Sequence, residues 1–92
     1  MVYEWNAAKA RANLKKHGVS FEEAATVFLD PLALTFSDPD HSIDEMREIT
    51  IGCTTGNTII FVSHCQRGQR LRLISARKAT IIKRKHYEEG IC

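Results

Sequence analysis

The chain has 92 residues, of which 43% are hydrophobic, and a formal net charge of +2. This length supports one hydrophobic core and excludes a second, so we expect a single domain over residues 1–92. No stretch approaches the roughly 20 apolar residues that span a bilayer, and the N-terminus lacks the charged start and apolar centre of a signal peptide. We therefore expect a cytoplasmic protein.

Two helices are predicted in the N-terminal third, after a short edge strand over residues 2–5. Asn6 is a suitable N-cap for the first helix, which ends at Gly18. Ser20 and Glu23 form a capping box for the second helix, which a proline ends. The predicted core face of this second helix consists of Phe21, Ala24, Ala25, Phe28 and Leu29.

The hydrophobic pattern then changes to a period of two, which is typical of an antiparallel sheet. Arg47 stands at the end of an apolar row that we expect to face the core. On the last strand, Leu71, Leu73, Ser75 and Arg77 are expected to share one face. Strands are predicted over residues 32–36, 47–53, 58–65 and 70–76, an acidic loop over 37–45, and a final helix over 81–89.

This order of elements predicts an α+β domain. The two N-terminal helices are expected to pack on a four- to five-stranded, mainly antiparallel sheet. The C-terminal helix is expected to close one end of the domain.

Charge is divided between two blocks of the sequence. Residues 22–48 contain eight acids and one base, whereas residues 67–87 contain eight bases and no acid. A one-sided basic run attracts polyanions, whereas a merely solvated face usually mixes signs. We interpret residues 67–87 as an RNA-binding surface; the alternative is a solvated helix beside an edge strand that charge protects from pairing.

The cysteines do not indicate a metal site. Cys53, Cys65 and Cys92 form no C-x-x-C pair, and structural zinc usually draws on paired ligands. His64 and Cys65 are neighbours on a predicted strand, so they point to opposite faces and cannot bind one ion together. We expect neither a metal nor another cofactor.

Signatures of nucleotide binding and of common hydrolases are absent, as are clustered carboxylates for two-metal chemistry. The sequence offers cations, histidines and a tyrosine, which are the groups that a metal-independent ribonuclease needs. Such an enzyme orients the RNA 2′-hydroxyl for attack on the neighbouring phosphate, stabilises the developing charge and protonates the leaving oxygen.

Several blocks of the sequence are similar to one protein family. They are Glu4-Trp5-Asn6, Lys9, the block N-L-K-K-H-G-V-S-F-E-E-A from residue 13, Phe28-Leu29-Asp30-Pro31, Ile51-Gly52, the block I-S-A-R-K-A-T from residue 74, and Tyr87-Glu88. In this order and at this spacing, the blocks resemble the BrnT toxins of bacterial type II toxin-antitoxin systems over nearly the whole chain.

The resemblance implies a RelE-like fold and RNA cleavage that inhibits bacterial growth. It also implies neutralisation by a BrnA antitoxin with a ribbon-helix-helix DNA-binding domain. In that family the toxin-antitoxin complex represses its own operon, and the antitoxin reads the operator DNA. We expect two toxins bridged by an antitoxin dimer, without membrane association.

Two arginines are the first catalytic candidates. Arg77 lies in the I-S-A-R-K-A block, where a bidentate guanidinium can clamp a phosphate; an ion pair with Glu23 or Glu88 is the alternative. Arg47 matches the arginine that the family carries after its acidic loop. Its alternative role is a salt bridge that holds this loop.

Tyr87 and His64 are the candidates for proton transfer. Tyr87 can contact the scissile phosphate or donate a proton, or it can simply anchor the last helix. His64 can act as acid or base because the usual pKa of histidine lies near neutrality. His17 is interpreted as a partner of the helix dipole and His41 as part of the acidic loop. The residues expected to contact RNA are Lys9, Lys16, Arg70, Arg72, Lys78 and Arg84.

The resemblance breaks after Thr80, where the family carries Arg-Arg-Glu and this chain has Ile81-Ile82-Lys83. If that glutamate is a catalytic base, the chain is a degenerate toxin that binds RNA and acts as antitoxin partner and co-repressor. If the glutamate only completes a capping box with Thr80, its loss costs about 1 kcal/mol of helix stability and leaves the chemistry intact. The sequence leaves both readings open.

Overall fold

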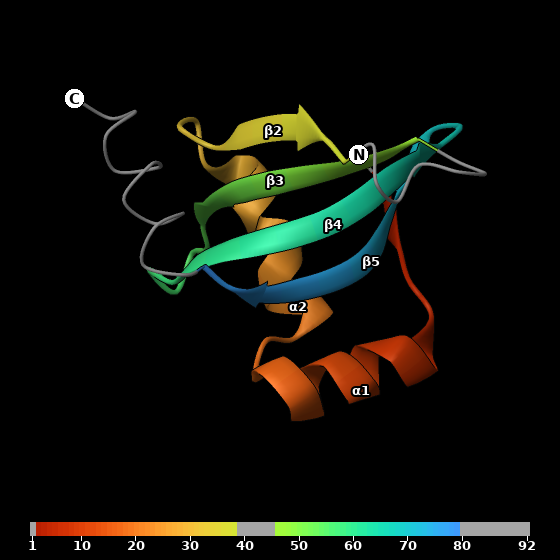
Figure 1. Ribbon diagram of the computed structural model, residues 1–92, viewed down its shortest axis with the longest axis vertical. Helices are drawn as coiled ribbons and strands as arrows, with labels where there is room; N and C mark the ends of the chain where they lie inside the picture. Colours follow the sequence, from red (N-terminus) through yellow and green to blue (C-terminus); the bar gives the residue numbers. More distant parts are fainter. Residues whose placement is uncertain (1, 39–45, 80–92) are drawn as a thin grey trace.

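The computed structural model describes residues 2–38 and 46–79. They form a five-stranded sheet with strand order β1-β5-β4-β3-β2, accompanied by two helices (Figure 1). The elements are β1 (Val2–Glu4), α1 (Ala7–His17), α2 (Phe21–Ala25), the 3₁₀ helix η1 (Thr26–Leu29), β2 (Leu34–Ser37), β3 (Arg47–Cys53), β4 (Ile59–Arg67) and β5 (Arg70–Lys78). The predicted α+β class is confirmed.

Strands β2 to β5 form an antiparallel meander, and β1 joins the sheet as a parallel edge strand beside β5. The sheet is therefore mixed but mainly antiparallel. The predicted strand boundaries agree to within two residues, with β2 shifted toward its C-terminus and β5 longer. The predicted helix over residues 81–89 lies outside the described residues, as does most of the predicted acidic loop. No helix within the described ranges is long and apolar enough to span a membrane.

The helix ends follow the predicted capping signals. The Asn6 side chain accepts a hydrogen bond from the Lys9 backbone N–H at 3.0 Å, and Gly18 ends α1 with a φ of 71°. The Ser20 hydroxyl accepts a bond from the Glu23 backbone N–H at 3.1 Å. The Glu23 carboxylate does not complete a capping box in this way; it accepts a hydrogen bond from the Thr54 hydroxyl at 3.3 Å.

The main core lies between the sheet and the segment α2–η1. Phe21 and Ala24 are buried there as predicted, but Leu29 is 72% exposed and Val27 takes its place. The second helix was predicted to continue to residue 29, whereas its α-helical part ends at Ala25. The following 3₁₀ turn has three residues per turn, so its side chains point in directions that a continuous α-helix does not predict. The sheet contributes Ile60, Val62, Leu71, Leu73 and Ala76 to this core.

The segment after η1 docks tightly on β3. The Asp30 carboxylate accepts hydrogen bonds from the backbone N–H groups of Leu32 at 2.9 Å and Cys53 at 2.8 Å. A Cβ atom at Gly52 would lie 3.0 Å from side-chain carbons of Val27 and Ala33. Only glycine therefore permits this close approach.

The two faces of the sheet differ in what they contact. One face packs on α2 and η1, and we call the other the distal face. Ile49, Ile51 and Cys53 gather with Phe61 in a second, smaller cluster, apart from the main core. The row that begins at Arg47 was predicted to face the core, but it lies on the distal face.

A β-bulge changes the direction of the side chains along β5. The register pairs His64 with Leu73 but Ser63 with Ser75, so Ile74 is an additional residue. Leu73 therefore lies in the main core, whereas Ser75 and Arg77 belong to the distal face. The prediction that these residues share one face is wrong, because strict alternation does not allow for an inserted residue.

Candidate active site

The distal face carries a pocket of about 300 Å³. Side chains from β2, β3, β4 and β5 form it, together with the C-terminal residue of α1. The pocket combines an apolar wall, two hydroxyl groups, one carboxylate and three groups that carry or can carry positive charge. Its lining consists of His17, Phe36, Asp38, Arg47, Ile49, Phe61, Ser63, Ile74, Ser75 and Arg77.

One cross-strand row forms the middle of the pocket. Phe36 pairs with Ile49, Ile49 with Ser63, and Ser63 with Ser75, so the row crosses four strands from the β2 edge to β5. Its apolar half therefore lies toward β2 and its hydroxyl half toward β5. The bulge adds Ile74 beside Ser75 in the lining.

Arg77 lies at one end of the pocket, next to Phe61 across the β4–β5 pair. Its guanidinium carbon is 5.6 Å from the centre of the Phe61 ring, within the range of a cation–π contact. This contact restricts the direction of the side chain while the planar group retains its N–H donors. Glu23, a predicted ion-pair partner for Arg77, instead accepts a hydrogen bond from Thr54.

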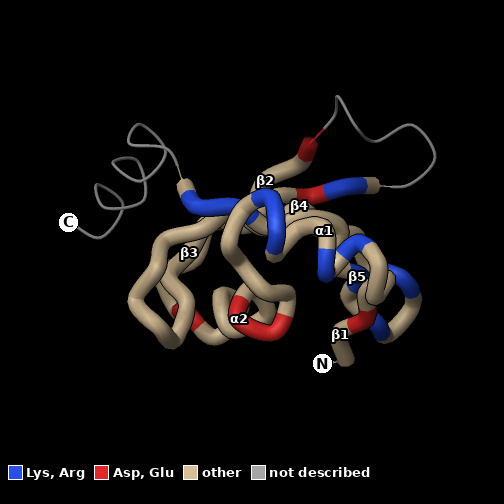
Figure 2. The backbone as a smooth tube through the Cα atoms, turned by 90° about the horizontal axis from the view of Figure 1, so that it is seen from below, with Lys and Arg blue, Asp and Glu red and all other residues tan. Residues whose placement is uncertain are grey.

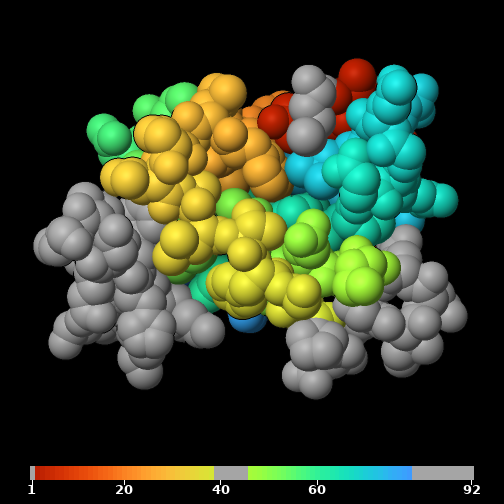
Figure 3. Space-filling view, turned by 90° about the horizontal axis from the view of Figure 1, so that it is seen from above, coloured from red at the N-terminus to blue at the C-terminus, as the bar shows by residue number. Residues whose placement is uncertain are grey.

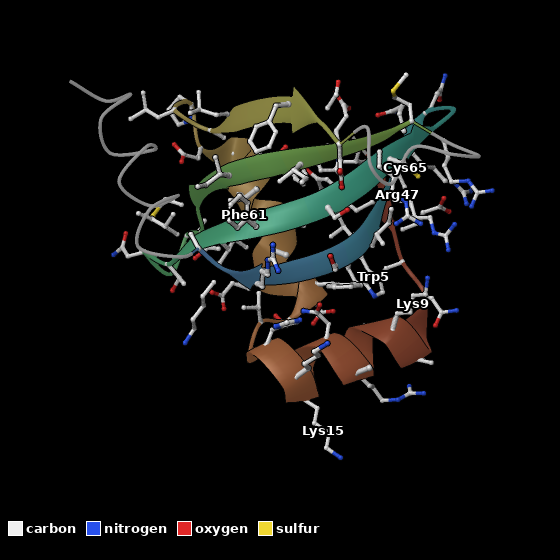
Figure 4. All side chains as sticks on the ribbon, in the orientation of Figure 1. Trp5, Lys9, Lys15, Arg47, Phe61 and Cys65 are labelled. Atoms are coloured by element: carbon white, nitrogen blue, oxygen red, sulfur yellow. The ribbon has the colours of Figure 1, made fainter. Side chains whose placement is uncertain are left out.

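Arg47 lies at the opposite end of the pocket. It is the partner of Cys65 on β4, four residues away from Phe61 along that strand, and Figure 4 shows Arg47 and Phe61 at opposite ends of the sheet. From the usual strand spacing and rise per residue, the Cα atoms of Arg47 and Arg77 are separated by roughly 17 Å. The two arginines therefore lie at opposite ends of one pocket. The Arg47 carbonyl accepts a bond from the Asp38 N–H at 2.9 Å, which ties Asp38 to the start of β3.

His17 was interpreted from the sequence as a partner of the helix dipole, yet it lines the pocket together with Ser75 and Arg77. It is half-buried at the end of α1, which lies along the β5 edge of the sheet in Figure 1. Gly18 follows it in the left-handed conformation and turns the chain away. The sequence signal was the K-H-G order, but helix spacing alone did not show which strand His17 approaches.

Asn13 explains how α1 is held in this place. Its side-chain amide donates to the carbonyls of Ala76 at 2.7 Å and Val19 at 3.0 Å, and its oxygen accepts from the Ala76 N–H at 3.0 Å. Strand β1 pairs only with Arg70 to Arg72, so the Asn13 amide occupies the β5 edge beyond it. Sequence reasoning did not identify this residue, although a buried asparagine inside a helix requires such a compensation.

His64 lies on the other face, away from the pocket. It is 3% exposed, its Nε2 is 2.7 Å from the Thr50 hydroxyl, and its ring meets Phe28 edge to face. Its Nδ1 is buried without a hydrogen-bond partner. Burial lowers the pKa of His64 below 6.5, and the Glu48 carboxylate partly offsets this shift. The structure does not bring this residue together with Arg77 and Arg47.

Comparison with known proteins decides the family. Residues 5–81 match the family model described as the ribonuclease toxin BrnT of type II toxin-antitoxin systems. The chain belongs to the BrnT family. The crystal structure of the Brucella abortus ribonuclease toxin BrnT is similar, with 27% sequence identity and a TM-score of 0.68 over 87% of this chain and 99% of that chain. No curated protein sequence matches.

BrnT membership confirms the resemblance inferred from the sequence blocks. The matched range contains the pocket residues but ends before Lys83, Arg84 and Tyr87. Arg84 and Tyr87 also lie outside the described residues. A type II toxin has an antitoxin as its partner, so this BrnT chain is one component of such a pair.

The remaining basic residues of this BrnT chain lie mainly along α1 and β5, as Figure 2 shows. Arg72 pairs across the strands with Cys65, the partner of Arg47, so these two arginines share a row. Arg70 forms an ion pair with Glu4 at 3.5 Å. The other three predicted RNA contacts within the described residues, Lys9, Lys16 and Lys78, are exposed.

Within residues 2–38 and 46–79, no group of three or more His, Cys, Asp or Glu side chains is placed to hold a metal ion. Cys53 and Cys65 are free thiols. The polar groups in the pocket lining are two guanidinium groups, one imidazole, two hydroxyl groups and the carboxylate of Asp38. The guanidinium, imidazole and hydroxyl groups can bind a phosphodiester, stabilise added negative charge on it and transfer a proton.

Proposed function

We propose that this BrnT-family toxin is a metal-independent endoribonuclease that inhibits bacterial growth. The observation that carries the proposal is the pocket on the distal face, which combines Arg77 and Arg47 at its two ends with His17 in the same lining. Two guanidinium groups and an imidazole in one pocket are suited to an RNA phosphodiester.

The reaction we propose is an internal transfer. The 2′-hydroxyl oxygen attacks the adjacent phosphorus, the bond from phosphorus to the 5′ oxygen breaks, and the products are a 2′,3′-cyclic phosphate and a 5′-hydroxyl. Arg77 donates hydrogen bonds to the non-bridging oxygens, on which negative charge develops. Arg47 holds a neighbouring phosphate, which fixes the strand for in-line attack.

Proton transfer is assigned to His17. It is the imidazole that lines the pocket, and it lies there with Arg77 and Ser75. One proton leaves the 2′-hydroxyl and one reaches the 5′ oxygen, and Tyr87 is the candidate for the second transfer. We do not retain His64 in a catalytic role, because it is buried on the other face.

The antitoxin in this proposal is a ribbon-helix-helix protein that covers the distal face and reads operator DNA on behalf of the complex of two toxins and two antitoxins. Opposite charge across such a contact speeds association. Arg72→Glu is expected to weaken both antitoxin and RNA binding, measured by titration calorimetry and by fluorescence anisotropy. Unchanged antitoxin affinity with weakened RNA binding would place the antitoxin on another surface.

The test of the catalytic proposal uses purified chain and end-labelled single-stranded RNA in excess EDTA. Discrete fragments with cyclic phosphate ends are expected. Fragments that form only after a divalent metal is added would contradict the mechanism. RNA binding without fragments under every condition would favour the alternative, a degenerate toxin that acts as antitoxin partner and co-repressor.

A further inference from the structure

The pocket contains more than a phosphate-binding site requires. Phosphate contacts need cations and N–H donors, yet half of the central row is apolar. Phe36 and Ile49 form that half, and neither adds charge or a hydrogen-bond donor. Phe36 is 41% exposed on the edge strand β2, whose side chains form part of the surface seen in Figure 3 (yellow).

Ser63, in the middle of the row, lies between the two arginines, and Phe36 lies to one side of them at the β2 end of the row. Arg47 is two residues from Ile49 along β3, and Arg77 neighbours Ser75, which ends the row. An RNA strand with one phosphate at each arginine therefore crosses the row near Ser63, and a base turned toward β2 would lie over Ile49 and Phe36. Ser63 and Ser75 supply hydroxyl groups at the β5 side of that base.

We propose that the pocket seats one unpaired nucleobase of the RNA, stacked on the Phe36 ring with its polar edge toward Ser63 and Ser75. This inference rests on the proposed function, and it makes Phe36 a specificity-determining residue. Single-stranded RNA is commonly recognised by unstacked bases that lie on aromatic side chains. A base in a duplex is paired and stacked on its neighbours, so double-stranded RNA does not fit.

The size of the pocket supports the same occupant. Its volume of about 300 Å³ is at the small end of the range for small-molecule sites. Such a space is sufficient for one nucleobase with its ribose. The bulge residue Ile74 adds an apolar contact beside Ser75, so a base meets carbon atoms as well as hydroxyl groups.

The test measures binding of short RNAs whose cleavage is blocked by 2′-fluoro groups, so that it does not depend on turnover. The probes are oligouridylate, oligoadenylate and a matched strand without bases, each followed by fluorescence anisotropy. Phe36→Ala is expected to weaken binding of the base-bearing strands by about 5- to 100-fold, from the usual worth of base stacking. Binding of the baseless strand should stay the same.

Two variants control for folding and for loss of apolar surface. Leu34 lies on the same face of β2 as Phe36 and is 45% exposed, but it does not line the pocket. The affinity of Leu34→Ala for the base-bearing strands is expected to change by less than about twofold. Phe36→Trp retains an aromatic face and should retain affinity. Circular dichroism melting confirms that each variant is folded.

Three results would overturn the inference. The first is an equal loss of RNA affinity in Phe36→Ala and Leu34→Ala, and the second is a Phe36→Ala loss as large on the baseless strand as on the base-bearing strands. The third is a wild-type affinity for duplex RNA equal to that for single-stranded RNA. The catalytic proposal fails separately. If the wild-type chain shows the expected binding pattern but never cleaves unmodified RNA, the nucleobase site is supported and the ribonuclease mechanism is wrong.

Discussion

The two faces of one sheet place two histidines in opposite surroundings. On the face that packs against α2 and η1, His64 is buried beside Thr50 and Phe28. On the distal face, His17 lies in a pocket with Arg77 and Arg47. Whether a histidine in this fold can contact a ligand therefore depends on the side of the sheet on which it lies.

The difference arises from small features of the backbone. Alternation along β4 sends His64 toward the helices, and the bulge at Ile74 turns Ser75 and Arg77 to the distal face. Asn13 then holds the end of α1 against the β5 edge, which brings His17 to the same pocket. One inserted residue and one buried amide thus assemble the site.

Replacing each histidine with glutamine tests most directly whether His17 and His64 differ in their roles. His17→Gln is expected to lower the RNA cleavage rate by about 10²-fold, because glutamine keeps a polar group but cannot transfer a proton. His64→Gln should cleave at nearly the wild-type rate under conditions where it is folded. Single-turnover cleavage with excess enzyme measures both, and equal losses in the two variants would contradict the assignment.

The next largest effect is expected at Asn13. Asn13→Ala leaves the buried Ala76 N–H and carbonyl without their partners, so the free energy of unfolding should fall by about 2–4 kcal/mol. Urea denaturation measures this change. Arg11→Ala on an exposed position of the same helix is the control and should change it by less than about 0.5 kcal/mol. A small effect at Asn13 would mean that other contacts hold α1.

The smallest effect concerns pH. Burial lowers the pKa of His64 in the folded protein below its usual 6.5, so the unfolded chain takes up a proton that the folded chain resists. The contribution of neutral His64 to the free energy of unfolding is then fully present above about pH 6.5. It decreases as the pH drops below this value, by at most about 1.4 kcal/mol per pH unit. Thermal melting of wild type and His64→Gln between pH 5 and 8 tests this. Parallel curves would show that His64 makes no contribution.

The sequence predicted what depends on local signals. Asn6, Gly18 and Ser20 act at the helix ends as their capping preferences indicate. Period-two patterning found all four meander strands, and the I-S-A-R-K-A block located Arg77, which the structure places in the pocket.

Features that depend on tertiary contacts were not predictable in the same way. A bulge at Ile74 has no sequence signature, so alternation placed Ser75 and Arg77 on the wrong face. The apolar row beside Arg47 is typical of a buried strand face, but it forms the smaller distal cluster. The approach of His17 to β5 depends on Asn13, whose partner Ala76 is 63 residues away.

The central claim is that the distal pocket, and not positive charge in general, cleaves RNA. Arg77→Ala and Lys15→Ala each remove one cation, and Figure 4 shows Lys15 projecting from α1 away from the sheet. Cleavage of labelled RNA in EDTA is expected to fall by about 10²- to 10³-fold for Arg77→Ala and by less than about twofold for Lys15→Ala. Equal rates for the two variants, whether both low or both unchanged, would contradict the account.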